Sequence, residues 1–290
     1  MKHIGLVLSG GMGKGAYQIG ALRALREFFL PSDFTYVSAA SIGALNTYSY
    51  LTDNLDKAHN IWSNVNLNGE RSFILSVLKG NFLQDAISDI ASGKSKVPFY
   101  VPLLDLSQRE LKYYNLANIS DEKIEAYLKA SIAMPFYNKG VPIDGKRLYD
   151  GAVVDNIPIY PVLKNELDYV IVVYFDDCNY IFENYEMDHK IIKLTFPDDK
   201  IISNSIQISH ASIMYMIEEG YNRTKDILSD IFSNGTEDLE FVYSRIEQRN
   251  VKQKTNKIRI TGDVIVSNMN KLVKRVVRHN KIINGGISHE

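Results

Sequence analysis

The chain has 290 residues, of which 45% are hydrophobic and 23% are charged, the proportions of an ordinary globular protein. Its 33 basic and 34 acidic residues give a formal net charge of -1, which excludes a polyelectrolyte binder of nucleic acid. Its single cysteine, Cys178, excludes a disulfide framework or a metal centre built from several cysteines within one chain.

No stretch approaches the ~18 consecutive apolar residues that a membrane span requires. The opening segment MKHIGLVLSGG holds an apolar run that is too short for a signal peptide. The sequence therefore predicts a cytoplasmic protein whose contact with a membrane, if it has one, is peripheral. Export by a route that leaves no N-terminal signal stays open.

The first part of the chain alternates strands and helices. Residues 3–9 are apolar and β-branched and predict a buried strand, and residues 14–29 have the spacing of a helix that ends before Pro31. A strand over 33–40 and a helix over 42–51 follow. This order predicts a parallel sheet with right-handed crossovers.

The middle of the chain has a mixed pattern. Residues 55–95 are mainly helical, and residues 97–106 predict a strand that pairs with 112–116. A helix over 120–134 begins with acidic residues, the favourable sign of charge for that end. Residues 142–158, with two Asp-Gly steps, predict a hairpin-like loop region.

The last part of the chain starts with two apolar strands, at 168–175 and 190–196. A long amphipathic helix follows over 204–232, within a C-terminal portion, 204–290, that is mainly helical. Because there is no internal repeat and no convincing linker, residues 1–290 are predicted to form a single domain.

A serine stands where a predicted strand turns sharply into a helix, in the segment AASIG at 39–43. A tight strand-to-helix turn lifts a hydroxyl out of the sheet and directs the helix N-terminus at a reacting carbonyl. Ala39 and Gly43, two residues to either side of Ser41, are as small as such a turn demands. The alternative is that Ser41 caps the helix.

The segment SGGMGKG at 9–15 has three interpretations. Residues 11–16 fit the loose dinucleotide pattern G-x-G-x-x-A, and Asp33 lies about twenty residues further on. The backbone amides could instead form an oxyanion hole, or the glycines could serve only a tight turn. A phosphate-binding P-loop is excluded because Lys14 is followed by Gly15 and not by serine or threonine.

A third segment, YDGAVVDNIPI at 149–159, contains an aspartate followed by two small residues. Asp150 can therefore occupy an exposed turn, where it could serve as a base. The alternative is an ordinary Asp-Gly turn, of which Asp144-Gly145 is a nearby example.

In this order and at this spacing, the segments GGMGKG, AASIG and DGA resemble the motifs of the patatin-like phospholipase family. Further similarity lies in GAYQIGALRAL after the first turn, ALN after the serine, KASIAMPF before the aspartate and VDNIPI after it. The resemblance is clearest over residues 3–175.

The resemblance implies an α/β fold related to the α/β-hydrolases, a three-layer sandwich with a mainly parallel central sheet flanked by helices. It implies a lipid acyl hydrolase, a phospholipase A-type esterase, with Ser41 as the nucleophile and Asp150 as the base of a catalytic dyad. It needs no metal and no cofactor. The implied oxyanion hole consists of the amides of Gly10, Gly11 and Met12, supported by Lys14.

Other positions would support these motifs through their small size or their place in a turn. Two of them depart from the family pattern, since Met12 replaces the third glycine of the first turn and Ala39 replaces the first glycine around the serine. The supporting positions are Gly13, Gly15, Ala39, Gly43, Gly151 and Ala152.

Three alternatives remain open at this stage. An α/β-hydrolase would place a histidine after the acid, and His189 or His210 could supply it. A nucleotide-binding α/β protein would use the glycine-rich turn for phosphate. A non-catalytic member of the family would bind lipid without cleaving it.

The expected substrate is a phospholipid or another acyl ester, and two segments could serve contact with lipid. The helical region 55–95 carries apolar residues that could cover or line a groove, the alternative being ordinary packing helices. Residues 268–284 combine an apolar helical face with several basic residues, a pattern typical of a helix that lies on an anionic membrane. The alternative for 268–284 is a last helix packed on the core with a solvated face.

Overall fold

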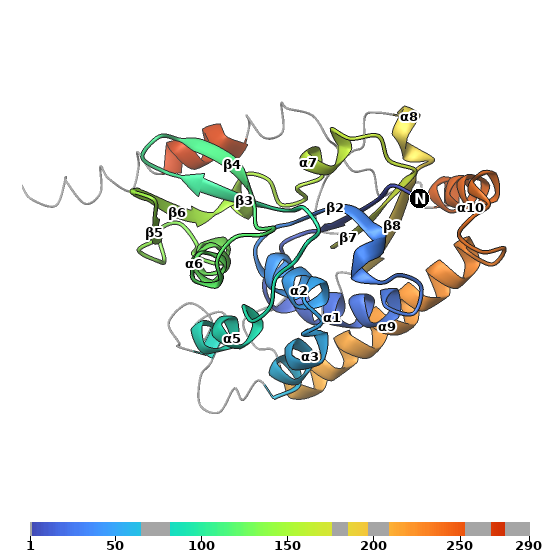
Figure 1. Ribbon diagram of the computed structural model, residues 1–290, viewed down its shortest axis with the longest axis horizontal. Helices are drawn as coiled ribbons and strands as arrows, with labels where there is room; N and C mark the ends of the chain where they lie inside the picture. Colours follow the sequence, from blue (N-terminus) through green and yellow to red (C-terminus); the bar gives the residue numbers. More distant parts are fainter. Residues whose placement is uncertain (1, 65–81, 176–184, 197–208, 253–267, 276–290) are drawn as a thin grey trace, which may run out of the picture.

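The computed structural model describes residues 2–64, 82–175, 185–196, 209–252 and 268–275. These residues contain one sheet of eight strands, drawn as arrows in Figure 1. The strands are β1 Ile4–Leu8, β2 Phe34–Ala39, β3 Phe99–Asp105, β4 Glu110–Asn115, β5 Val141–Ile143, β6 Lys146–Asp150, β7 Tyr169–Phe175 and β8 Ile191–Phe196.

Helices connect and cover these strands. They are α1 Gly15–Leu25, α2 Ile42–Leu51, α3 Leu55–Ser63, α5 Phe82–Ile90, α6 Asp121–Ser131, α7 Tyr160–Leu163, α8 Tyr185–Asp188, α9 His210–Ile231 and α10 Leu239–Lys252. Residues 268–275 are also helical. Single turns of 3-10 helix lie at η1 Met12–Lys14, η2 Pro31–Asp33 and η3 Gly151–Val153. None of the described helices is both long and apolar enough to cross a bilayer.

The sheet has the order β5-β6-β3-β2-β1-β7-β8, with β4 paired to β3. The five strands β3, β2, β1, β7 and β8 run parallel to one another, while β4, β5 and β6 are antiparallel to their neighbours. The predicted α/β fold with a mainly parallel sheet is therefore confirmed, as is the predicted pairing of the strands near 97–106 and 112–116.

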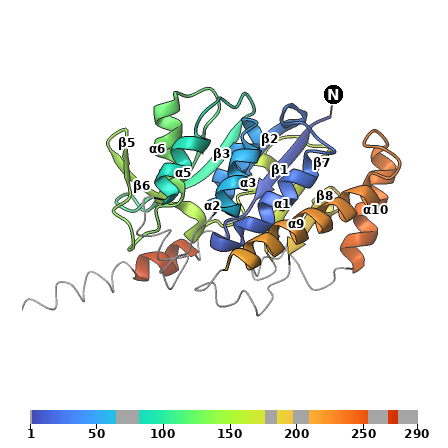
Figure 2. The ribbon, with the colours of Figure 1, turned by 90° about the horizontal axis from the view of Figure 1, so that it is seen from below.

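The alternation of side chains along β1 separates two apolar layers. Ile4, Leu6 and Leu8 belong to the large core cluster under α1, α2, α3, α5, α6 and α9, the helices that lie in front of the sheet in Figure 2. Val7 belongs to a second cluster on the opposite face, with Val162 of α7. The predicted three layers are present, but the second helical layer is thin.

Some boundaries differ from the predicted ones. The helix predicted over 14–29 ends at Leu25, and the one predicted to reach 134 ends at Ser131, because turns close both ends before the prolines are reached. Ser120 occupies the N-cap position of α6 without a hydrogen bond from its side chain. Residues 65–81, where part of a lipid groove is expected, lie outside the described residues.

Two strands meet head-on along one edge of β3, and this arrangement positions the site. β4 occupies one edge of β3 from Tyr100 to Asp105. The other edge is therefore shared by β2, which pairs at Phe99 and Tyr100, and β6, which pairs from Leu103 onwards. Because β2 is parallel and β6 antiparallel to β3, their carboxyl ends point at each other. Pro102, which has no N–H to donate, lies between the two paired stretches.

Candidate active site

Ser41 occupies the turn between β2 and α2. Its backbone has φ 54° and ψ -132°, a strained conformation for a residue with a side chain, of order 1–3 kcal/mol. The Ser41 side chain makes no capping hydrogen bond to α2, so the interpretation of this serine as a helix cap is wrong. The turn leaves the hydroxyl free to interact outside its own helix.

Small neighbours allow this turn. A Cβ atom on Gly43 would lie 2.5 Å from the carbonyl oxygen of Ser9, so only glycine lets α2 start this close to the end of β1. Ala39, in contrast, is a buried strand residue with a negative φ. An alanine methyl therefore replaces the family glycine there without backbone strain.

The glycine-rich turn lies directly against the serine. A Cβ atom on Gly10 would lie 2.9 Å from Cβ of Ser41 and 3.2 Å from Cβ of Ala152. A Cβ atom on Gly11 would lie 2.2 Å from the ring of Phe175, the last residue of β7. The segments that begin near residues 10, 41 and 150 thus converge, as their resemblance to the family motifs implies.

The predicted oxyanion donors are not equivalent. The Gly10 amide donates to the carbonyl of Asn156 at 3.1 Å, so it is already engaged and this part of the prediction has to be corrected. Within the described part of the chain, the amides of Gly11 and Met12 have no such partner. The ammonium group of Lys14 lies 5.6 Å from the centre of the Phe175 ring, so that side chain covers the turn through an aromatic contact.

Met12 holds its position only by adopting a left-handed backbone, with φ 49°. Glycine accepts this conformation freely, whereas an L-residue is strained in it. The left-handed backbone therefore explains why the family pattern has glycine at this position, and why methionine there is strained. Gly13 is buried in the same turn, and a Cβ on Gly15 would lie 2.8 Å from the Trp62 ring.

Asp150 ends β6 and is only 2% exposed. Its carboxylate has two hydrogen-bond partners, the Ser41 side chain and the Ala152 amide, the latter at 2.9 Å. Burial raises the pKa of Asp150 to about 7, and the two hydrogen bonds oppose that rise. A Cβ on Gly151 would lie 2.4 Å from the Pro102 carbonyl, which explains the glycine after the aspartate.

Two buried residues that the motif analysis did not single out connect the turns. Asn46 of α2 donates to the Gly15 carbonyl and to Oε1 of Gln18, both at 3.0 Å, and accepts from the Trp62 indole at 3.1 Å. Gln18 in turn donates to the Ser9 carbonyl at 2.6 Å. This network fixes the serine-bearing helix to the glycine-rich turn. Asn46 is part of the ALN segment, which was the only signal for it in the sequence.

Asn156 is a third residue whose role the sequence did not reveal. Besides accepting from the Gly10 amide through its carbonyl, it approaches the Gly10 carbonyl with its side-chain nitrogen at 3.4 Å. Asn156 therefore holds the glycine-rich turn against the loop that follows Asp150.

A second buried carboxylate precedes Asn156. Asp155 is 6% exposed and accepts a hydrogen bond from the Tyr113 hydroxyl at 2.5 Å. Burial raises the pKa of Asp155 to about 7 as well. It is bound to β4 and contributes to the loop, and it is not a hydrogen-bond partner of Ser41 or Asp150.

The structure gives less support to a dinucleotide site and to a catalytic histidine. Asp33 precedes β2 and accepts a hydrogen bond from the Leu30 amide at 2.7 Å. It therefore lies at the amino edge of the sheet, opposite the glycine-rich turn, and the dinucleotide interpretation is wrong on this point. His189 also lies at that edge, before β8, with its ring against Tyr243. His210 begins α9 and is exposed. No histidine of the described residues is a hydrogen-bond partner of Asp150.

The described residues contain no cluster of three or more histidine, cysteine, aspartate or glutamate side chains that could hold a metal ion. The chemistry that the described site itself offers is that of a hydroxyl, a buried carboxylate and backbone donors.

The chain is similar to proteins of one known family. A family model described as patatin-like phospholipase matches residues 6–163, more than half of the chain. The chain is 28% identical over 190 residues to the lysophospholipase NTE1 of Cryptococcus neoformans, aligning 59% of this chain with 11% of that protein. It is 25% identical over 183 residues to the NTE family protein Mb1092c of Mycobacterium bovis, aligning 59% with 48%. The chain thus spans less than half the length of these relatives.

Solved structures similar to the chain include VipD from Legionella pneumophila, with 12% identity and a TM-score of 0.45, covering 79% of this chain and 67% of that one. They also include the type III effector ExoU of Pseudomonas aeruginosa, with 12% identity and a TM-score of 0.45, covering 88% and 61%.

Proposed function

We propose that this chain, which belongs to the patatin-like phospholipase family, hydrolyses acyl esters of lipids with Ser41 as the nucleophile and Asp150 as the only general base. The observation that carries the proposal is the hydrogen bond between the Ser41 side chain and the Asp150 carboxylate at the meeting point of β2 and β6. A serine hydroxyl is a weak nucleophile until an adjacent base accepts its proton.

The first step uses the raised pKa of Asp150. A carboxylate whose pKa is about 7 is a stronger base than an ordinary one and is still largely ionised slightly above neutral pH. Asp150 accepts the Ser41 proton while Oγ of Ser41 attacks the acyl carbonyl. A tetrahedral intermediate forms, and its negative charge develops on the former carbonyl oxygen.

The Gly11 and Met12 amides are the donors that we assign to this oxyanion. Each such donor typically contributes ~2.7–4 kcal/mol to stabilisation of the transition state. The N-terminus of α2, which begins at Ile42, adds its partial positive charge. Gly10 serves instead to bring the turn against Ser41.

The intermediate then collapses, and Asp150 returns the proton to the oxygen of the leaving alcohol or lysolipid. Water attacks the acyl-enzyme, and Asp150 takes one proton from it and returns it to Oγ of Ser41. The sum is one ester and one water converted to one acid and one alcohol.

Phospholipids or lysophospholipids are the substrates we propose. The family is described as phospholipases, and one relative is named a lysophospholipase. Because the chain spans only part of such relatives, their names alone do not assign this substrate to it.

Hydrolysis of a soluble short-chain ester tests the dyad. Ser41→Ala should abolish turnover, and Asp150→Asn should lower it by roughly 10²–10⁴-fold, the usual contribution of general base catalysis. His189→Ala and His210→Ala should leave turnover unchanged. Turnover that survives Asp150→Asn but disappears in a histidine variant would favour a triad. A folded parent protein that does not hydrolyse the ester would favour a lipid-binding member without catalysis.

A further inference from the structure

The C-terminal helix 268–275 lies beside the candidate active site. The side chain of Asn268 donates to the Val154 carbonyl at 2.9 Å, four residues after Asp150. Leu272 is 6% exposed and packs with Leu104 and Val154. The part of 268–284 that the structure describes is therefore a helix packed on the core, as one of the two sequence interpretations predicts.

The outward side of this helix is basic. Lys271, Lys274 and Arg275 are exposed, and no acid of the described residues forms an ion pair with them. Packing on the core and presenting positive charge are thus not alternatives, because the same helix does both.

A loop with exposed aromatic rings precedes β5. Phe136 is 42% and Tyr137 is 71% exposed. Tyr149 connects the two features, since its ring packs in the cluster that contains Leu272 and its hydroxyl donates to the Lys139 carbonyl at 3.2 Å. The aromatic loop and the basic helix therefore flank the residue that precedes Asp150.

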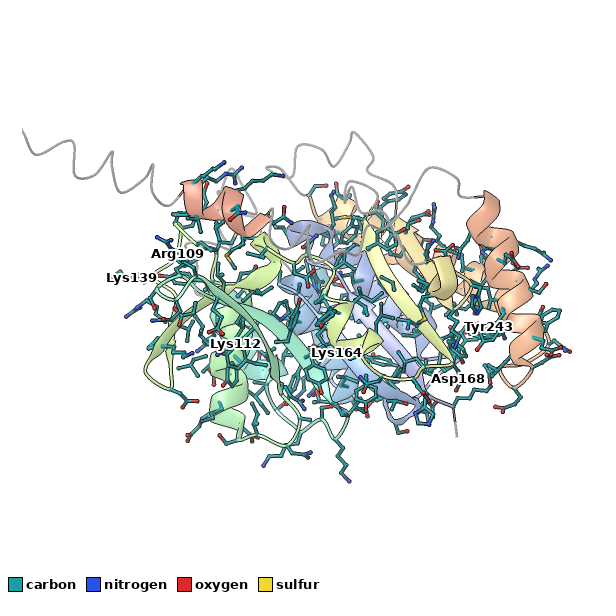
Figure 3. The ribbon with its side chains drawn as sticks, turned by 90° about the horizontal axis from the view of Figure 1, so that it is seen from above. Arg109, Lys112, Lys139, Lys164, Asp168 and Tyr243 are labelled. Atoms are coloured by element: carbon teal, nitrogen blue, oxygen red, sulfur yellow. The ribbon has the colours of Figure 1, made fainter. Side chains whose placement is uncertain are left out.

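Two acids of the neighbouring strands and turns are paired with lysines, Glu110 with Lys112 at 3.0 Å and Asp144 with Lys123 at 3.0 Å. Figure 3 shows Arg109 and Lys139 on the side of the molecule that carries the helix. The basic helix thus shares one side of the molecule with these two further cations.

We propose that these residues form a docking surface for an anionic lipid bilayer, made of Phe136, Tyr137, Lys139, Lys271, Lys274 and Arg275. Aromatic rings favour the interface between headgroups and acyl chains, and basic side chains are attracted to anionic headgroups. Because the chain belongs to a family described as phospholipases, a bilayer is favoured over a nucleic acid. The surface brings the neighbourhood of Ser41 and Asp150 to the lipid; this part of the inference rests on the proposed function, whereas binding itself does not.

The test uses the Ser41→Ala background, so that no lipid is cleaved during the measurement. Cosedimentation compares vesicles of phosphatidylcholine alone with vesicles that also contain phosphatidylglycerol. We expect binding to the anionic vesicles only, weakened by salt. Combined Lys271→Ala, Lys274→Ala and Arg275→Ala should weaken it about a hundredfold, at about fivefold per charge. Tyr137→Ser should weaken it without changing its salt dependence.

The matched control removes three charges elsewhere. Lys94, Lys96 and Lys164 are exposed and precede the parallel strands β3 and β7, so they lie at the amino edge of the sheet. Their combined change to alanine should leave binding almost unchanged. Circular dichroism verifies that each variant is folded.

Several results would overturn the docking surface: equal binding to neutral vesicles, equal loss in the control and the helix variant, or tighter binding to DNA than to anionic vesicles. With Ser41 restored, the helix variant should hydrolyse a soluble ester at the parent rate. If the parent does not hydrolyse that ester but the helix variant alone loses vesicle binding, the proposed function fails and the docking surface stands.

Discussion

At the scale of single residues, Met12 makes a prediction about stability. Its left-handed backbone, with φ 49°, costs an L-residue roughly 1–2 kcal/mol, while glycine loses about 0.5–1 kcal/mol in chain entropy. Met12→Gly should therefore raise the free energy of unfolding by up to about 1 kcal/mol, measured by urea denaturation, without lowering turnover. Ala16→Gly, in the regular helix α1, is the control and should destabilise the protein by about 1 kcal/mol. Equal destabilisation by both changes would contradict the account.

Asp150 makes a second prediction, about pH. Since the base must be ionised, turnover should rise with pH through about 7. Stability should move the opposite way. The folded pKa of about 7 lies above the ordinary value of 3.8, so the folded state holds a proton that the unfolded state releases, and stability falls as pH rises from about 4 to about 7.

Asp150→Asn removes this penalty. The amide oxygen can still accept from the Ala152 amide, so the variant should have strongly lowered turnover yet be more stable than the parent at pH 8, by a few kcal/mol at most. Thermal unfolding at pH 8 and pH 4 checks this, and the difference should shrink at the lower pH. A variant that is less stable than the parent at pH 8 would show that burial of the ionised Asp150 carboxylate does not destabilise the folded protein.

At the scale of elements, the position of α2 depends on the network around Asn46. Asn46→Ala would remove the donor to Oε1 of Gln18 and the acceptor of the Trp62 indole N–H, each loss costing roughly 1–3 kcal/mol. We expect a loss of stability of this order and a lower kcat, because the serine turn is no longer fixed to the glycine-rich turn. Asn64→Ala, on an exposed asparagine, is the control and should be nearly neutral. Normal turnover in a destabilised Asn46→Ala protein would show that the network stabilises the fold but does not position the active site.

The crossing of α1 and α9 depends on two glycines. A Cβ on Gly20 would lie 2.0 Å from the Ile217 carbonyl, and one on Gly220 would lie 2.1 Å from the Tyr17 carbonyl. The two backbones are in contact and neither can give way as a side chain would, so Gly220→Ala should destabilise the protein by roughly 2–3 kcal/mol. Ser229→Ala, at an exposed position of the same helix, should not. Thermal unfolding measures the two changes in stability. Unchanged stability in Gly220→Ala would contradict the close crossing of the two helices.

At the scale of the whole molecule, local patterns in the sequence predict an α/β fold with a parallel sheet, whereas the convergence of the three motifs is implied by their resemblance to a known family. The turn around Ser41 needs small neighbours, and each apolar strand is visible by its composition. The features that the sequence did not predict depend on contacts between residues that are far apart along the chain. The head-on meeting of β2 and β6 is one example, since nothing near Asp150 shows that it will share an edge of β3 with β2. The engagement of the Gly10 amide by Asn156 is another.

The proposed mechanism depends on activation of the Ser41 hydroxyl by the Asp150 carboxylate. Labelling with a fluorophosphonate, followed by mass spectrometry of the modified peptide, measures this activation. We expect the label on Ser41, a labelling rate that rises with pH through about 7, and almost no labelling of Asp150→Asn in a protein that is still folded. Label on another residue, or labelling of Ser41 at the parent rate in Asp150→Asn, would contradict the mechanism.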